Sequence, residues 1–123
     1  MDPRHAQRIK TIQNLFALSF DSLSNNLPYP TDKKTIDLQA HLTVIDSLIK
    51  KYAPKYPLQK IAKTDLAILR LSIYELTIEK KEPEKVIIDE AIELAKELSG
   101  EKSYGFVNAV LGKVLDNSLD SHD

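Results

Sequence analysis

The segment from Asp65 to Leu76 carries apolar side chains on nearly every side of a helical wheel. It reads DLAILRLSIYEL, and no Pro or Gly follows it until Pro83. A helix that is hydrophobic all round is stable only when it is buried. At 3.6 residues per turn, the segment predicts a central helix of about four turns, around which the other helices pack.

The composition favours a single helical domain without disulfides. The chain has 123 residues, 42% of them hydrophobic, with three Gly and no Cys. This length allows one core, and the missing thiols are typical of the reducing cytosol, so we expect a cytoplasmic protein. No run reaches the roughly 18 apolar residues of a membrane span. The net charge of −1 leaves only local basic patches to attract nucleic acid.

Two long helices are expected in the N-terminal half. Residues 1–21 form the first, with one apolar face made of Ile9, Ile12, Phe16 and Phe20. A loop containing Pro28 and Pro30 separates it from a second helix over residues 36–53, for which Thr35 is a plausible N-cap. The apolar positions of the second helix follow a 4-3-4-3 spacing: Leu38, Leu42, Ile45, Ile49 and Tyr52.

The C-terminal half is expected to add a short turn at residues 58–63, the central helix and two more helices. The first of these begins either near Pro83 or at Asp89 as N-cap, and Gly100 suits its C′ position. Ser103 would cap the last helix. We therefore predict one all-α domain, residues 1–116, with small helical bundles at 1–53 and 58–116, and a flexible tail at 117–123.

The sequence lacks the patterns of catalysis. Its three His are scattered, no phosphate-binding Gly-rich loop occurs, and no Ser–His pair has a nucleophile setting. A row at Glu90, Glu93 and Glu97 could hold a cation, but such a row is far more often a solvated helix face. We expect no enzyme activity, cofactor or metal site, which leaves binding as the function.

Two basic regions could bind phosphates. Arg4 and Arg8 share a face of the first helix, with His5 at its edge. The second region has no acid between Asp46 and Asp65, and it interleaves two tyrosines with lysines at positions 50, 51, 55, 60 and 63. For both regions a solvated surface is the plainer interpretation and a phosphate track the alternative.

An ordered series of motifs in the C-terminal half resembles the NusB family of bacterial transcription antitermination factors. The series is DLAILR from Asp65, YEL from Tyr74, Pro83 with Val86, IDEAIELAK from Ile88, and Ser103 with FVNAVL from Phe106. The N-terminal half matches more loosely, through RHAQR at positions 4–8 and QNLF at positions 13–16.

The resemblance implies two small helical bundles joined by a long central helix. It implies a binding protein rather than a catalyst. The family takes boxA-type single-stranded RNA of ribosomal RNA transcripts, together with ribosomal protein NusE, in an RNA polymerase antitermination complex. The resemblance implies that RNA is contacted by Arg4, His5, Arg8, Phe16, Lys102, Ser103 and Phe106. Asp65 matches an acidic family position that we assign to the protein partner, with an N-cap as the alternative.

Several alternatives stay open at this point. Phe16 and Phe106 could be core residues, and Arg70 with Glu75 could form an internal ion pair. Ala6 and Gln7 thin the basic cluster, so a protein-interaction module with weak or no RNA binding is the competing function. An exposed Phe16 or Phe20 would favour a homodimer.

Overall fold

The described residues of the computed structural model, 2–21, 26–100 and 104–120, contain helices and no strand. They form six α-helices: α1 (Pro3–Phe20), α2 (Lys33–Gln39), α3 (Leu42–Tyr52), α4 (Lys63–Tyr74), α5 (Glu84–Leu98) and α6 (Tyr104–Asp120). A 3₁₀ turn, Leu58–Lys60, precedes α4, and a π-helical turn, Glu75–Glu79, follows it. The predicted all-α class is confirmed. None of these helices is long and apolar enough to cross a membrane.

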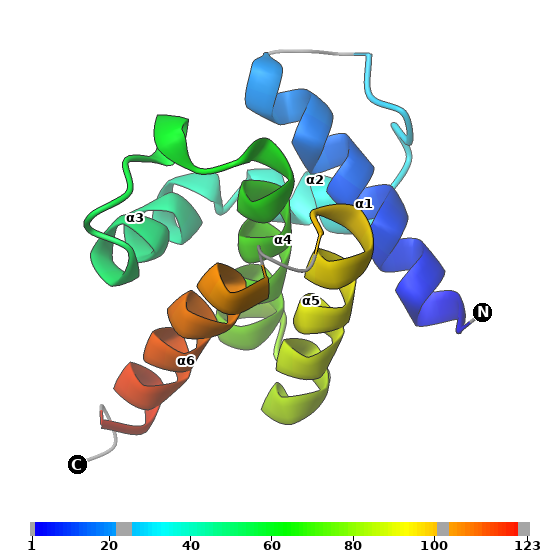
Figure 1. Ribbon diagram of the computed structural model, residues 1–123. Coiled ribbons are helices and arrows are strands. Elements are labelled where there is room, and N and C mark those ends of the chain that lie inside the picture. Colours follow the sequence, from blue (N-terminus) through cyan, green and yellow to red (C-terminus); the bar gives the residue numbers. More distant parts are fainter. Residues whose placement is uncertain (1, 22–25, 101–103, 121–123) are drawn as a thin grey trace.

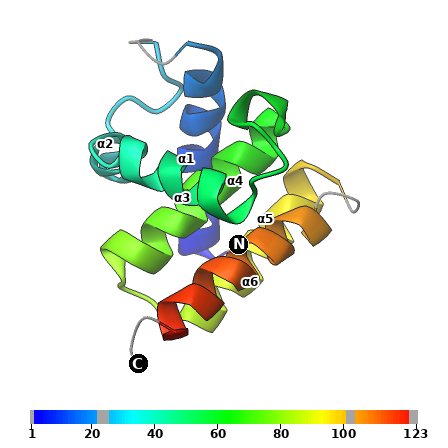
Figure 2. The ribbon, with the colours of Figure 1, turned by 90° about the vertical axis from the view of Figure 1, so that its left-hand side faces the viewer.

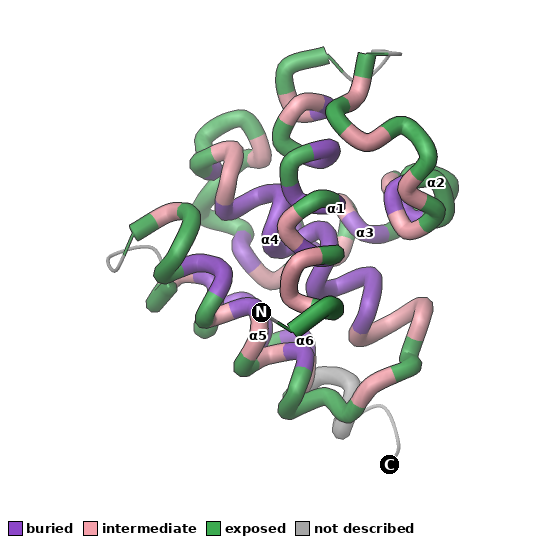
Figure 3. The backbone as a smooth tube through the Cα atoms, turned by 90° about the vertical axis from the view of Figure 1, so that its right-hand side faces the viewer, coloured by how far each residue is buried: buried purple, intermediate pink, exposed green. Residues whose placement is uncertain are grey.

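Helix α4 is the centre of the fold (Figure 1). Every residue from Asp65 to Glu75 is buried, as the continuous purple stretch in Figure 3 shows. Helices α1, α3, α5 and α6 all contact α4. The apolar residues on every side of α4 are therefore buried against neighbouring helices, as predicted.

The helices around α4 form two groups. Helices α1 and α3 pack on one part of α4, with α2 packed on α1, and α5 and α6 lie side by side against another part (Figure 2). One continuous cluster of buried apolar side chains joins both groups, with members such as Leu15 of α1, Ile45 of α3 and Leu111 of α6. The two groups therefore share a single core through α4.

The helix predicted for residues 36–53 is in fact two helices. The backbone leaves helical geometry at His41 (φ −114°, ψ 11°), between α2 and α3. The apolar face continues across this break, because Leu38, Ile45 and Ile49 are all buried. Neither Pro nor Gly marks the break, so the sequence pattern carried no sign of it.

The predicted N-cap Thr35 is also wrong, because Asp32 caps α2. The Thr35 backbone N–H donates to Oδ2 of Asp32 at 3.3 Å, and the Thr35 hydroxyl donates to the same oxygen at 2.6 Å. Thr35 itself lies inside the first turn and is buried. Both residue types cap helices well, and the position of the loop decides between them.

The ends of α5 follow the sequence closely. Pro83 directly precedes the helix, so the alternative N-cap Asp89 lies inside it. At the other end the Gly100 N–H donates to Ala95 O at 3.0 Å, and Gly100 has φ +103°. This left-handed conformation is the reason why Gly suits C′. Helix α6 continues to Asp120, so residues 117–120 of the expected tail are helical.

Candidate nucleic-acid interface

Helix α1 is rotated relative to its predicted orientation. Of the four residues expected on its apolar face, only Ile12 is buried, whereas Phe16 and Phe20 are 39% and 65% exposed. The buried face instead combines three polar residues, Arg8, Thr11 and Asn14, with three apolar ones, Ile12, Leu15 and Leu18. The core interpretation of Phe16 is therefore wrong.

Asn14 is one reason for this rotation. Its amide Nδ2 donates to Tyr29 O at 2.8 Å and to the Thr35 hydroxyl at 2.8 Å, and its Oδ1 accepts from Tyr29 N at 2.9 Å. These bonds hold the proline-containing loop and the start of α2 against α1. A buried amide needs such partners, so Asn14 faces inward and turns Phe16 and Phe20 outward.

Phe16, Phe20, Lys63 and Leu98 form what we call the α1–α4 aromatic surface. The two phenylalanine rings meet edge to face, with centroids 5.1 Å apart. The Lys63 ammonium lies 4.8 Å from the centroid of the Phe20 ring. Phe16 and Leu98 also line a shallow groove of about 460 Å³. The surface therefore combines exposed ring faces with a positive charge, where the end of α1 approaches the start of α4 (Figure 1).

Asp65 lies in the first turn of α4 and is only 6% exposed. The N-cap position is occupied by Ala62, so the N-cap interpretation of Asp65 is wrong. Its Oδ1 is buried without a hydrogen-bond partner among the described residues. The positive end of the α4 dipole favours a carboxylate at this position.

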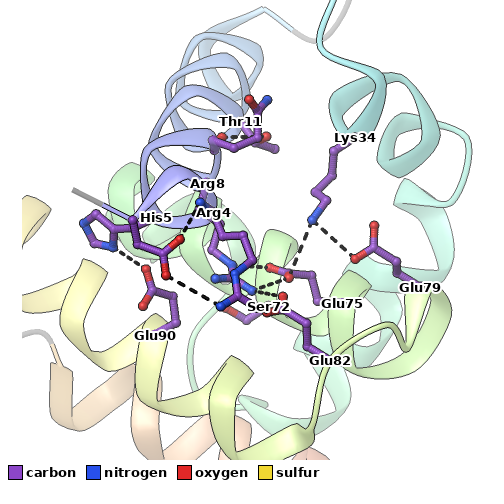
Figure 4. Close-up of polar contacts among 12 residues, drawn as sticks. Arg4, His5, Arg8, Thr11, Lys34, Ser72, Glu75, Glu79, Glu82 and Glu90 are labelled. Carbon is purple, nitrogen blue, oxygen red and sulfur yellow. Dashed lines mark hydrogen bonds and ion pairs between the residues drawn. The ribbon is translucent and has the colours of Figure 1, made fainter.

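The basic residues at the start of α1 are held by glutamates (Figure 4). Arg8 donates through Nε and Nη2 to Glu75 at 3.0 and 2.8 Å, and it also pairs with Glu82. The Lys34 ammonium lies 3.6 Å from Glu75 and 3.3 Å from Glu79. Burial is the largest single effect and lowers the pKa of Arg8. The hydrogen bonds to Glu75 and the negative charges of Glu75, Glu82 and Glu90 together outweigh it, so the pKa of Arg8 is raised.

The expected Arg70–Glu75 ion pair is absent because both residues have other partners. Arg70 donates to both carboxylate oxygens of Asp46 on α3 at 2.9 Å, and Glu75 pairs with Arg8. Residues five apart lie on different sides of a helix, unlike residues three or four apart. The Arg8–Glu75 pair joins residues 67 positions apart, so local spacing could not reveal it.

His5 bridges two carboxylates of α5. Its Nε2 lies 2.9 Å from Oε2 of Glu97, and its Nδ1 contacts Oε1 of Glu90. The hydrogen bond to Glu90 is the main cause that raises the pKa of His5, against the opposing effect of burial. Two members of the carboxylate row noted in the sequence therefore bind a histidine. The described residues contain no group of three or more His, Cys, Asp or Glu placed to hold a metal ion.

Arg4 is the most accessible of the three α1 residues assigned to RNA. Its side chain is 68% exposed, and its Nη1 donates to Glu82 at 2.9 Å. The Arg8 side chain, by contrast, is 6% exposed and that of His5 is 18% exposed. Arg4 can exchange a surface partner for a phosphate at little cost, whereas Arg8 would have to leave a buried carboxylate.

Phe106 is half-buried on α6 and meets the exposed Tyr56 edge to face, with ring centroids 5.1 Å apart. Lys102 and Ser103 lie outside the described residues. Tyr56, Phe106 and Lys113 of α6 line one groove. From the sequence, Tyr56 was recognised only as part of the lysine-rich region, and nothing indicated that Lys113 lies near it. Tertiary folding alone brings these residues together.

The lysine-rich region remains a cationic surface. Across the described ranges 2–21, 26–100 and 104–120, no ion pair involves Lys50, Lys51, Lys55, Lys60 or Lys63. Lys63 and Lys51 instead lie over the rings of Phe20 and Tyr52. The charge available to an anion is therefore greater here than at the start of α1.

Comparisons with known proteins agree with this architecture. The model of the NusB family matches residues 6–116. The chain is similar to transcription antitermination protein NusB of Lactiplantibacillus plantarum, with 36% identity over 95% of this chain and 97% of that protein. It is 49% identical to NusB of Acetivibrio thermocellus over 64% of this chain, a match that spans only about half (54%) of that protein.

Solved structures show the same fold. NusB of T. maritima superposes with a TM-score of 0.78 and 31% identity, covering 91% of this chain and 89% of that chain. The NusB–NusE complex with dsRNA provides another similar chain, with a TM-score of 0.75 and 20% identity over 93% of this chain and 96% of that one. At 20% identity the likeness concerns the fold.

Proposed function

This chain belongs to the NusB family of transcription antitermination proteins, and from this premise we propose that it binds boxA-type single-stranded RNA together with ribosomal protein NusE. In this role it would act within an RNA polymerase antitermination complex. The proposed role is binding and positioning, without a chemical step.

The α1–α4 aromatic surface is the observation that carries this proposal. Unpaired RNA bases stack on exposed aromatic rings, and lysines beside the rings pair with the phosphates. Phe16 and Phe20 offer the rings, and Lys63 offers the charge at 4.8 Å from Phe20. A solved structure with this fold holds NusB and NusE in complex with dsRNA, which supports RNA and NusE as the general classes of partner.

We assign different roles to the three basic residues of α1. Arg4 contacts RNA phosphate directly, since its guanidinium is exposed. His5 contributes positive charge when it is protonated between its two glutamates. Arg8 fixes α1 against the end of α4 through Glu75 and reaches RNA only by giving up that partner.

The remaining residues complete the proposed interface. Phe106 stacks on a base, and Lys102 and Ser103, which precede α6 in the sequence, bind phosphate. Asp65 faces the protein partner, because a carboxylate there repels RNA phosphates.

The test measures binding of a short boxA-like single-stranded RNA, with and without NusE, across a salt series. We expect Phe16→Ala to weaken binding about tenfold, the value of one base stack. Arg4→Ala should reduce the slope of log affinity against log salt by about 0.7. Val44→Ala, which removes an exposed apolar side chain from α3, is the control. Equal binding by all four proteins would contradict the proposal.

A second candidate function is a NusB-fold protein-interaction module with weak or no RNA binding. The ion pairs that occupy Arg4, His5 and Arg8 favour it, because they leave little free charge at the start of α1. In that case NusE would bind with unchanged affinity in the presence of RNA, and Phe16→Ala would weaken NusE binding alone.

A homodimer formed through the α1–α4 aromatic surface would compete with RNA. Exposed apolar patches on a small domain are common association sites. If this dimer forms, RNA affinity falls as protein concentration rises, and Phe20→Ser yields a monomer by sedimentation. A sedimentation coefficient that is independent of concentration would contradict the dimer.

A further inference from the structure

A groove of about 450 Å³ lies between the segment after α3 and helix α6. We call it the α3–α6 groove and define it by Tyr52, Lys55, Tyr56, Phe106 and Lys113. Its floor is apolar, with Phe106 meeting Tyr56 edge to face at 5.1 Å and an angle of 72°. Tyr56 is 51% exposed, so part of its ring is open to solvent.

The described residues at the rim of the groove carry positive charge and no negative charge. Lys55 comes from the loop and Lys113 from α6, and both are exposed. Among the described residues that line the groove there is no Asp or Glu. Among the described residues neither lysine belongs to an ion pair, whereas Arg4, His5 and Arg8 of α1 are paired with glutamates.

This combination matches one occupant better than others. An apolar protein helix would fill the groove but would offer no negative charge to complement the two lysines at its rim. A nucleotide satisfies both parts, because its base has a flat apolar face and its phosphates are anionic. The distribution of charge and rings therefore fits a single-stranded nucleic acid.

We propose that the α3–α6 groove is a second nucleotide-binding subsite. An unpaired base stacks on Tyr56 beside Phe106, and the flanking phosphates pair with Lys55 and Lys113. The proposal rests on the proposed RNA-binding function and extends the RNA beyond the α1–α4 aromatic surface. The proposal also gives the lysine-rich region a role in binding RNA phosphates. The basic residues at the start of α1 fill this role only in part, because they are paired with glutamates.

The first test compares charge variants. With a single-stranded RNA, Lys55→Ala/Lys113→Ala should reduce the slope of log affinity against log salt by about 1.4, or roughly 0.7 per phosphate contact. Lys33→Ala/Lys81→Ala is the matched control, because it removes two exposed lysines that line a different cleft, next to α2. A slope that is the same in both double variants would overturn the proposal.

The second test examines stacking at position 56. Tyr56→Ala should weaken RNA binding about tenfold, and its exposure makes a folding defect small. Tyr56→Trp should keep the wild-type affinity, since the larger ring still stacks. The chain contains no Trp, so this substitution introduces a single tryptophan that can be excited separately from the tyrosines, and its emission should be quenched by RNA. Binding without quenching would place the RNA elsewhere.

The outcomes separate this proposal from the general one. If the wild-type protein binds RNA and all groove variants bind equally well, the groove proposal fails and RNA binding stands. If the wild-type protein does not bind RNA with or without NusE, both fail. If the groove variants weaken NusE binding and leave RNA binding unchanged, the groove belongs to the protein partner and the proposal is overturned.

Discussion

Arg8 and Glu75 form a bidentate ion pair that is almost fully removed from water between α1 and the end of α4. Their side chains are 6% and 2% exposed. Removing two charges from water is costly, and the pair is stable only because its hydrogen bonds are well aligned. Any other orientation of α1 on α4 would separate the pair and leave an unpaired charge buried. The pair therefore favours a single orientation of α1.

The first prediction concerns this pair. Arg8→Met should lower the free energy of unfolding by about 3 kcal/mol, since Glu75 is left buried and, among the described residues, Lys34 at 3.6 Å is its one remaining cationic partner. Urea unfolding followed by circular dichroism measures the change. Arg4→Ala is the control and should change stability by less than about 1 kcal/mol, because its pair with Glu82 is exposed on the Arg4 side.

A double variant sharpens this prediction. Arg8→Met/Glu75→Leu removes both buried charges and should recover most of the stability that Arg8→Met loses. If the double variant is as unstable as the sum of both single variants, the two side chains do not interact as described.

The second prediction concerns His5. Because its folded-state pKa is raised, the protonated ring stabilises the contact between α1 and α5. This contribution is fully present below the ordinary pKa of about 6.5 and is lost as pH rises through the raised value. The stability difference between wild type and His5→Gln should therefore shrink with rising pH above about 6.5.

Unfolding midpoints in urea between pH 5.5 and 9 test this dependence. His41→Gln is the matched control, since its ring contacts the backbone carbonyl of Asp37 at 2.9 Å rather than a carboxylate. If the difference between wild type and His5→Gln stays constant or grows with pH, the histidine does not bridge Glu90 and Glu97 as a cation.

At the scale of the elements, Asp32 joins α1, the proline-containing loop and α2. Its carboxylate accepts hydrogen bonds from Thr11 at 2.6 Å, from Gln7 at 2.6 Å, and from the hydroxyl and N–H of Thr35. Burial would raise the pKa of Asp32, but the hydrogen bonds from Thr11 and Thr35 outweigh burial and lower it. The short helix α2 therefore depends on this one cap.

The third prediction follows from that dependence. Asp32→Ala should reduce stability at neutral pH by about 1–2 kcal/mol, the upper part of the range for a lost N-cap. The ionised cap contributes fully above its ordinary pKa of 3.8 and is lost as pH falls through the lowered folded-state value. The difference from wild type should therefore shrink below about pH 4. Exposed Asp37→Ala in the same helix is the control.

The elements differ in how well the sequence predicts them. The apolar pattern on all sides placed α4 correctly, and Gly100 marked the end of α5, because these are local signals. The start of α5 was left open between Pro83 and Asp89, and the structure selects Pro83. The break at His41 left no mark, since the apolar face runs through it. The rotation of α1 was missed because its buried face is partly polar, and Asn14 and Arg8 find their partners only in the folded chain.

The candidate interface shows the same limit. The sequence placed Phe16 on α1 and gave its exposure as one of two possibilities, and the family resemblance named the residues for RNA. Neither could show that Arg4, His5 and Arg8 form ion pairs with glutamates of α5 and of the segment after α4. Pairs this far apart in sequence form only when helices pack, so free charge is a property of the whole fold.

At the scale of the whole molecule, the two predicted sub-bundles share α4 and one core. Leu15 of α1 and Leu111 of α6 are 1% and 0% exposed, and both belong to the same buried cluster. A structural unit unfolds independently only when few buried contacts join it to its neighbour. Here α4 packs against helices of both groups, so we expect residues 1–116 to unfold as one domain.

Amide hydrogen exchange on two variants tests this last prediction. Leu15→Ala and Leu111→Ala should each cost about 2–5 kcal/mol, the usual range for emptying a buried leucine site. In a single cooperative domain, either substitution lowers the protection of the slowest amides in α1, α4 and α6 by the same amount, because these amides exchange only on global unfolding. Val44→Ala, on an exposed position of α3, should leave protection within about 0.5 kcal/mol of wild type.

If Leu111→Ala weakens protection in α5 and α6 while α1 and α3 stay unchanged, the sub-bundles are separate cooperative units. The α1–α4 aromatic surface would then form independently of the α3–α6 groove.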